Sequence, residues 1–153
     1  MNYQAFPSRS RSSDDTGLGG LALLAIASAT EICEAVPELQ ARGFFAAIGR
    51  RMAALESLDD LSDAALLSMR INDFWRALDW GEAKLELTDE GIIVQHTNLP
   101  RGIAPDPRGH WATMLAGVLE GAYDSWFRTL GSGPALTTTA EWKGDTLELR
   151  HGR

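Results

Sequence analysis

The stretch Glu82–Thr97, EAKLELTDEGIIVQHT, constrains the fold more than any other part of the chain. Ala83, Leu85 and Leu87 alternate with charged residues, which is the period of a strand with one buried face. A turn sequence, TDEG, follows at Thr88–Gly91, and IIVQHT then supplies a return strand. Strands joined by so short a connection pair antiparallel, because parallel strands need a crossover of a dozen residues or more. The chain therefore contains an antiparallel hairpin.

The residues before this hairpin have a helical period instead. Ser57–Asp60 (SLDD) resembles a capping sequence, so we expect a helix to start there. Gly81 is expected to end this helix with a positive φ, and Trp80 to plug the corner between the helix and the hairpin. Apolar residues spaced by three or four predict its buried stripe, which consists of Ala64, Leu67, Ile71, Phe74 and Leu78.

Similar patterns predict the remaining elements and an α+β fold. We expect helices over 18–35, 38–55 and 110–130, and a second hairpin from Ala135 onwards with its turn at Lys143–Asp145. Pro37 suits the first turn of the second helix, and Gly43 and Gly49 suggest close helix contacts. The expected architecture has the N-terminal helices and one later helix packed on antiparallel β-hairpins. Residues 1–17 are expected to form a flexible tail, and residues 18–153 a single α+β domain.

Charge and composition exclude several classes of function. The net charge of −7 argues against binding to nucleic acid or to anionic lipid surfaces. The most apolar run, Gly17–Ala29, is shorter than the ~20 residues of a membrane-spanning helix, so we expect no membrane insertion. This run could instead belong to a signal peptide, but Asp14 and Asp15 precede it where such a peptide needs positive charge. We therefore expect a cytoplasmic protein.

The sequence contains no pattern that indicates a catalytic, cofactor or metal site. His96, His110 and His151 are scattered, and Cys33 is the single cysteine, so we expect no metal site and no cofactor. Glu120 and Asp124 lie four residues apart on one helix, and such a pair of acids could act in a glycosidase. A solvated helix face is the more common explanation of this spacing.

The aromatic residues carry more information. Five tryptophans in 153 residues could form a core, a subunit interface or a stacking surface for sugars. Composition favours core or interface over sugar stacking. We predict that Trp75, Tyr123, Trp126 and Phe127 contribute to a subunit interface.

Three stretches resemble the D subunit of bacterial cellulose synthase complexes: LDWGEAKLEL (Leu78–Leu87), NLPRG (Asn98–Gly102) and GHWATMLAGVLEGAYDSWF (Gly109–Phe127). The family pattern has a W-G-x-x-K-L-x-L corner, a short L-P loop and a helix reading W-x-x-x-L-x-G/P-V-L-E-G-x-Y-x-x-W. GFFAAIGRRMA (Gly43–Ala53) is similar to an earlier family helix that ends in G-R-x-M-A. The residues that fit the corner, loop and later helix are Trp80, Gly81, Lys84, Leu85, Leu87, Leu99, Pro100, Trp111, Val118, Leu119, Glu120, Gly121, Tyr123 and Trp126.

This resemblance implies a non-enzymatic accessory protein with an α+β fold. The family assembles as a ring-shaped octamer, a tetramer of dimers, whose inner passages guide nascent β-1,4-glucan chains and organise the synthase complexes. The family's N-terminal region lines these passages, which would place glucan contacts at Tyr3, Gln4 and Phe6 here. Implied partners are further copies of the chain, other cellulose synthase subunits and a proline-rich scaffold protein. The family has also been described as periplasmic, which is the alternative to the cytoplasm.

Two other functions remain open from the sequence. The first is a small ligand-binding or regulatory domain of the same fold, with a closed pocket lined by Cys33 or the histidines. The second is a glycoside hydrolase that uses Glu120 and Asp124, for which the two carboxyl groups would have to face a substrate cleft.

Overall fold

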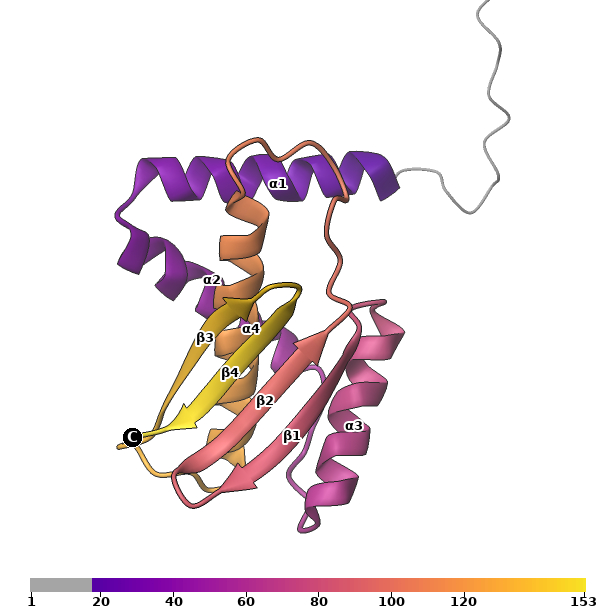
Figure 1. The fold of residues 1–153 in the computed structure, drawn as a ribbon, viewed down its shortest axis with the longest axis vertical. Helices are drawn as coiled ribbons and strands as arrows, with labels where there is room; N and C mark the ends of the chain where they lie inside the picture. The colour runs from indigo at the N-terminus through magenta and orange to yellow at the C-terminus, as the bar shows by residue number, and fades with distance from the viewer. Residues whose placement is uncertain (1–17) are drawn as a thin grey trace, which may run out of the picture.

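A computed structural model describes residues 18–153 and confirms the α+β class (Figure 1). The four strands form one antiparallel sheet in the order β1-β2-β4-β3, so the two expected hairpins join through β2 and β4. In chain order the elements are α1 (Leu18–Ala35), α2 (Glu38–Ala53), α3 (Ala64–Ala77), β1 (Glu82–Thr88), β2 (Gly91–Thr97), α4 (His110–Thr129), β3 (Thr137–Lys143) and β4 (Thr146–Gly152).

Alternation along the strands gives the sheet one buried face. Val94, His96, Leu147 and Leu149 are fully buried on this face, where α4 packs. Figure 1 shows α4 behind the sheet, α2 crossing α4, α1 lying across the top and α3 beside β1. The core therefore lies between the sheet and α4, and α2 closes it on the far side.

Glycines bring α2 and α4 into close contact. A Cβ atom at Gly49 would lie 1.8 Å from the carbonyl oxygen of Val118, and one at Gly121 would lie 2.0 Å from that of Ala46. Only residues without a side chain allow the two backbones to approach so closely. Gly49 thus marks a close helix contact as expected, whereas nothing lies within 4 Å of a Cβ atom at Gly43.

Helix α3 begins later than its capping sequence predicts. Its N-cap is Asp63, whose carboxylate accepts a hydrogen bond from Ala65 N–H at 2.8 Å, while Ser57 Oγ donates to Asp59 instead. Its buried face is also rotated from the expected stripe, because Ile71, Asn72 and Trp75 are buried and Leu78 is 41% exposed. The prediction from SLDD was wrong because the same Ser-x-x-Asp spacing also occurs in turns.

The corner between α3 and β1 uses two residues with positive φ. Asp79, at φ 54°, closes the helix, and Trp80 N–H then donates to the carbonyl of Trp75 at 2.9 Å. This is a Schellman ending with Asp79, not Gly81, in the left-handed position. Gly81, at φ 74°, is needed for a different reason: its Cβ atom would lie 1.9 Å from the carbonyl oxygen of Thr97.

A side chain of α3 covers part of the edge of the sheet. The buried amide of Asn72 donates to the carbonyl of Ala83 at 2.9 Å and accepts from its N–H at 2.7 Å. Both free backbone groups of Ala83 are thereby satisfied, as a neighbouring strand would satisfy them. Asn72 thus fixes α3 against β1.

Candidate functional site

The four aromatic residues predicted for a subunit interface lie in the core of the chain itself. Trp75, Tyr123, Trp126 and Phe127 are each exposed by 2% or less. The Trp75 ring contacts those of Trp126 and Tyr123, at centroid distances of 5.5 and 6.1 Å. Because these rings present almost no surface in the folded chain, we expect a contact between folded subunits to use other residues.

Trp80 stacks against this aromatic cluster at the corner of α3 and β1. Its ring is parallel to that of Trp75 at a centroid distance of 5.9 Å, and it meets the edge of Trp111 at 6.5 Å. The prediction that Trp80 plugs the corner is therefore confirmed.

A directed chain of hydrogen bonds runs through the cluster and includes a histidine that the sequence did not single out. Trp75 Nε1–H donates to the Tyr123 hydroxyl at 3.0 Å, and that hydroxyl lies 3.0 Å from His96 Nδ1. His96 Nε2 lies 2.7 Å from the carbonyl oxygen of Trp80, which can only accept, so Nε2 carries a proton. The only sign of this role in the sequence is the place of His96 on the inward face of a strand.

The two acids considered for glycosidase chemistry are each held by other partners. Glu120 forms an ion pair with Arg42 of α2. Asp124 accepts hydrogen bonds from Arg128 at 2.7 Å and from the Thr138 hydroxyl at 3.0 Å. Both carboxylates thus tie α4 to its neighbours, which accounts for their spacing without a substrate.

The other histidines and the cysteine have separate surroundings in the fold. His110 begins α4 and lies 3.6 Å from Glu34, while His151 is buried on β4 with Nδ1 2.8 Å from the Thr138 hydroxyl. Burial lowers the pKa of His151, and it raises the pKa of the half-buried Cys33 thiol. Within residues 18–153, no group of three or more His, Cys, Asp or Glu residues is arranged to hold a metal ion.

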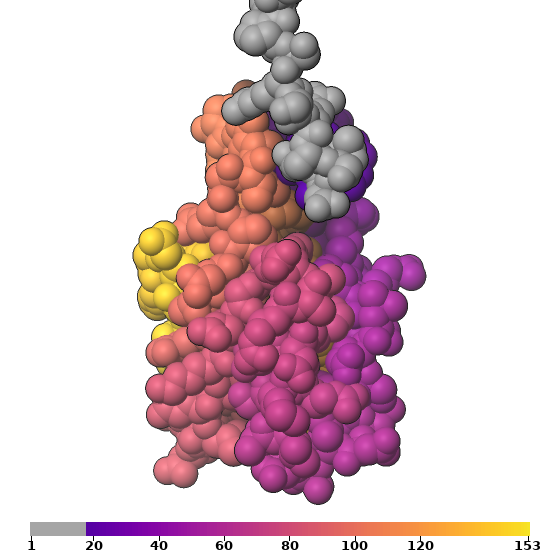
Figure 2. All heavy atoms as spheres, turned by 90° about the vertical axis from the view of Figure 1, so that its right-hand side faces the viewer, coloured from indigo at the N-terminus to yellow at the C-terminus, as the bar shows by residue number. Residues whose placement is uncertain are grey.

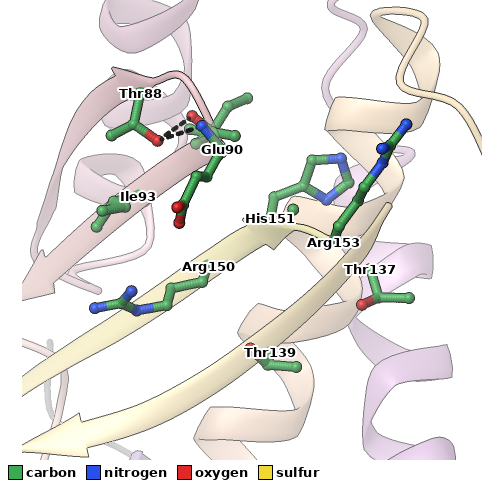
Figure 3. A pocket seen from close by; sticks show the side chains of 11 residues that line it. Thr88, Glu90, Ile93, Thr137, Thr139, Arg150, His151 and Arg153 are labelled. Atoms are coloured by element: carbon green, nitrogen blue, oxygen red, sulfur yellow. Dashed lines mark hydrogen bonds between the residues drawn. The ribbon is translucent and has the colours of Figure 1, made fainter. Parts of the chain in front are cut away.

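A small cavity lies at the end of the sheet, between β2, β3 and β4 (Figure 3). Its volume is about 190 Å³, and its polar lining includes Thr88, Glu90, Thr137 and Arg150. Sites for small molecules usually measure roughly 300–1,000 Å³. Two other hollows reach this range, one of about 400 Å³ between α1 and residues 105–108 and one of about 800 Å³ beside the turn at 88–91, but neither includes Cys33 or a histidine. The small cavity includes His151 but neither Cys33 nor His96, so it matches only part of the pocket that a ligand-binding domain would need.

The most unusual surface lies on α1. Four leucines of its first half are 54–62% exposed, namely Leu18, Leu21, Leu23 and Leu24, while Ile26 and Ala29 are buried. Among the described residues, α1 is the one helix whose length and composition would allow it to span a membrane. Some core helices of soluble proteins and some signal sequences have the same length and composition. The run Gly17–Ala29 is shorter than a membrane span, but α1 continues beyond it to Ala35. Exposed apolar surface of this kind marks a place of association.

The glucan contacts expected at Tyr3, Gln4 and Phe6 lie outside the described residues.

An α+β fold with an aromatic core and an apolar helix on its surface defines a protein suited to association with other molecules. Comparison with known proteins identifies the family. The chain belongs to the family of the cellulose synthase D subunit, whose profile matches residues 23–152.

Relatives in two species share one description. Two proteins of Komagataeibacter xylinus called cellulose synthase operon protein D are 40% identical over 63 residues and 34% identical over 82 residues. A protein of that description from Komagataeibacter sucrofermentans is 33% identical over 82 residues. These matches cover 39%, 52% and 52% of this chain and 38%, 51% and 51% of the relatives, so the chain spans about half the length of these relatives or less.

Proposed function

We propose that this protein is a non-catalytic accessory subunit of a bacterial cellulose synthase system. The observation that carries the proposal is the family match over residues 23–152, which includes every strand and most of each helix. The proposed role is to organise synthase complexes and to guide nascent β-1,4-glucan chains toward crystalline cellulose.

The bonding of the interior supports a role without catalysis. Glu120 pairs with Arg42, and Asp124 is held by Thr138 and Arg128, so neither carboxylate is free to act as a general acid or nucleophile. The buried polar groups of the aromatic cluster are likewise bonded to one another.

We propose that a second copy of the chain covers the exposed leucines of α1, and that such dimers assemble into a ring-shaped octamer. Burying four leucines that are now about 60% exposed would contribute about 4–7 kcal/mol per subunit. Beyond these leucines, α1 is fixed to the rest of the fold by buried Ile26 and Ala29 and by the Glu34–Arg108 ion pair. This attachment favours a protein partner over a lipid bilayer as the cover, since a bilayer would have to surround the whole helix.

The remaining parts of the proposal concern the binding partners and the cellular compartment. Tyr3, Gln4 and Phe6 are the proposed glucan contacts, by analogy with the family's N-terminal region. Other cellulose synthase subunits and a proline-rich scaffold are the proposed protein partners, and the cytoplasm is the proposed compartment.

A complementation experiment tests this function. A cellulose-producing strain that lacks its own member of this family would receive the wild-type chain, a Leu21→Glu/Leu24→Glu variant or a Leu55→Glu variant. Leu55 is the matched control because it is 80% exposed but lies outside α1. We expect the wild type and the control to restore cellulose yield and the crystalline order measured by X-ray diffraction, and the α1 variant to fail. If the wild type restores neither property, the proposed function is wrong.

A further inference from the structure

Helix α3 is the most weakly attached helix next to the sheet. It packs mainly against β1 and buries only Ile71, Asn72 and Trp75. Figure 2 shows α3 and the segment before it on the outer surface of the molecule. Within the non-helical segment 54–63 that joins it to α2, Leu58 is buried at 1% exposure, but residues 59–63 between Leu58 and α3 are mostly exposed. Residues 59–63 on one side and the corner at Trp80 on the other are the places about which α3 could move.

Trp75 is the only large ring that α3 buries completely, and the hydrogen-bond chain holds it in place. Each hydrogen bond in this series has a fixed donor: Trp75 donates to Tyr123, Tyr123 donates to His96, and His96 donates to the carbonyl of Trp80. The bonds thereby link α3, α4, β2 and the α3–β1 corner.

This arrangement accepts only a neutral His96. A second proton would occupy Nδ1, and the Tyr123 hydroxyl would then face two donors and lose the acceptor for its own proton. A buried donor without an acceptor is costly. Protonation of this one ring therefore breaks the chain at its centre.

The surroundings of His96 offer nothing to stabilise the added charge. Ala83 of β1 and Leu147 of β4 pair with it, Trp75 and Tyr123 contact its ring, and Trp80 supplies a carbonyl. Of these groups only Tyr123 can titrate, and burial raises its pKa, so it stays neutral. The neighbouring charged residues of β1, Glu82 and Lys84, lie on the exposed side of that strand. Burial accordingly lowers the pKa of His96 to about 4, against the smaller opposing effect of the hydrogen bond to Trp80.

We propose that α3 and its corner form an acid-released flap, latched by the hydrogen-bond chain through His96. When His96 takes up a proton, the Tyr123 hydroxyl that holds Trp75 loses the acceptor for its own proton, the closed form is destabilised, and α3 swings away about residues 59–63. The rings of Trp126 and Tyr123, which Trp75 covers in the closed form, then become accessible. This regulation is separate from the proposed role in cellulose synthesis and does not depend on it.

The size of the effect follows from the two states of His96. The latched ring titrates at about 4 and an open ring at an ordinary pKa of about 6.5, so the open form binds more protons between these values. The closed form therefore has its full stability relative to the open form above pH 6.5, and this stability decreases as the pH falls below 6.5. At pH 5 the opening equilibrium constant should be about 30-fold larger than at pH 8.

Hydrogen exchange on the full-length protein tests the flap. Between pH 8 and pH 5, amides of residues 64–81 should lose protection after correction for intrinsic exchange, while amides of α2 and α4 keep theirs. His96→Gln is the informative variant, because its neutral amide can donate to Trp80 and accept from Tyr123 without titrating. His110→Gln is the control, since His110 lies at the start of α4 and outside the chain of hydrogen bonds.

We expect His96→Gln to abolish the acid-dependent loss of protection in α3 and His110→Gln to leave it unchanged. The proposal is overturned if α3 opens no more at pH 5 than at pH 8, or only together with the whole fold. It is equally overturned if His96→Gln folds and keeps the wild-type pH dependence. If that variant does not fold, the wild-type exchange profile decides alone.

Discussion

Replacing Gly121 by alanine should destabilise the protein strongly, although alanine is the better helix former. The new Cβ atom would lie 2.0 Å from the carbonyl oxygen and 2.6 Å from the Cα atom of Ala46, where ordinary contacts measure 3.4–4 Å. Both groups belong to the backbone of α2, so no side-chain rotation relieves the clash and the helices must move apart. Overpacking costs about 1–3 kcal/mol, and a rigid backbone neighbour places this case at the upper end. The gain of about 0.5–1 kcal/mol in helix propensity leaves a net loss of roughly 2 kcal/mol.

Urea unfolding monitored by tryptophan fluorescence measures this loss. Gly43→Ala is the control, because Gly43 lies within α2 but nothing would lie within 4 Å of its Cβ atom. The control should raise the free energy of unfolding by about 0.5–1 kcal/mol through helix propensity alone. If both variants are stabilised alike, the close α2–α4 contact does not exist and the packing described above is wrong.

Three further substitutions test other contacts. Asn72→Ala should lower the free energy of unfolding by about 2–4 kcal/mol in urea, because it leaves the buried N–H and carbonyl of Ala83 without partners. Asp106→Ala should cost about 1 kcal/mol in the same assay, because the Asp106 carboxylate caps α4 by accepting from the N–H groups of His110 and Trp111 at 3.1 and 3.0 Å; an unchanged midpoint would contradict this role. Glu120→Gln should leave cellulose output unchanged in the complemented strain, and a loss of output without a loss of stability would restore the case for catalysis.

The elements with a strong hydrophobic period were predictable from the sequence. Alternation from Ala83 to Leu87 and the turn at Thr88–Gly91 predict the two strands of the first hairpin, and β1 and β2 occupy this stretch. The helix expected over 110–130 corresponds to α4, which is His110–Thr129. Its apolar face fits a helix that lies between a sheet and another helix. In such cases burial enforces the pattern along the whole element, so local residues carry enough information.

Helix α3 was harder to predict because one of its side chains has a role that no pattern encodes. The buried face of α3 contains Asn72, whose amide replaces a strand partner at the sheet edge. Periodicity treats asparagine as a surface residue and therefore rotates the predicted stripe toward Leu78. Similarly, composition identifies aromatic residues such as Trp126 as anchors but does not distinguish the core of one chain from an interface between two.

The parts of the candidate site that depend on residues far apart in the sequence could not be predicted from the sequence either. His96 and Tyr123 are 27 positions apart, and only the packing of the sheet against α4 brings His96 Nδ1 within 3.0 Å of the Tyr123 hydroxyl. The exposed leucines of α1 are visible as an apolar run, but their exposure becomes known only once the structure shows which side of the helix is covered. The proposed assembly surface therefore rests on the fold, whereas the family resemblance was carried by the corner at Trp80 and by α4.

The molar mass of the full-length protein in solution tests the central claim most directly. Size-exclusion chromatography with light scattering at micromolar concentrations should give about 130 kDa for eight copies of the 16.6-kDa chain, with dimers as the smaller species on dilution. The Leu21→Glu/Leu24→Glu variant should shift the protein toward monomers while its circular dichroism spectrum stays unchanged. A wild-type protein that remains at 16.6 kDa over this concentration range would contradict the account.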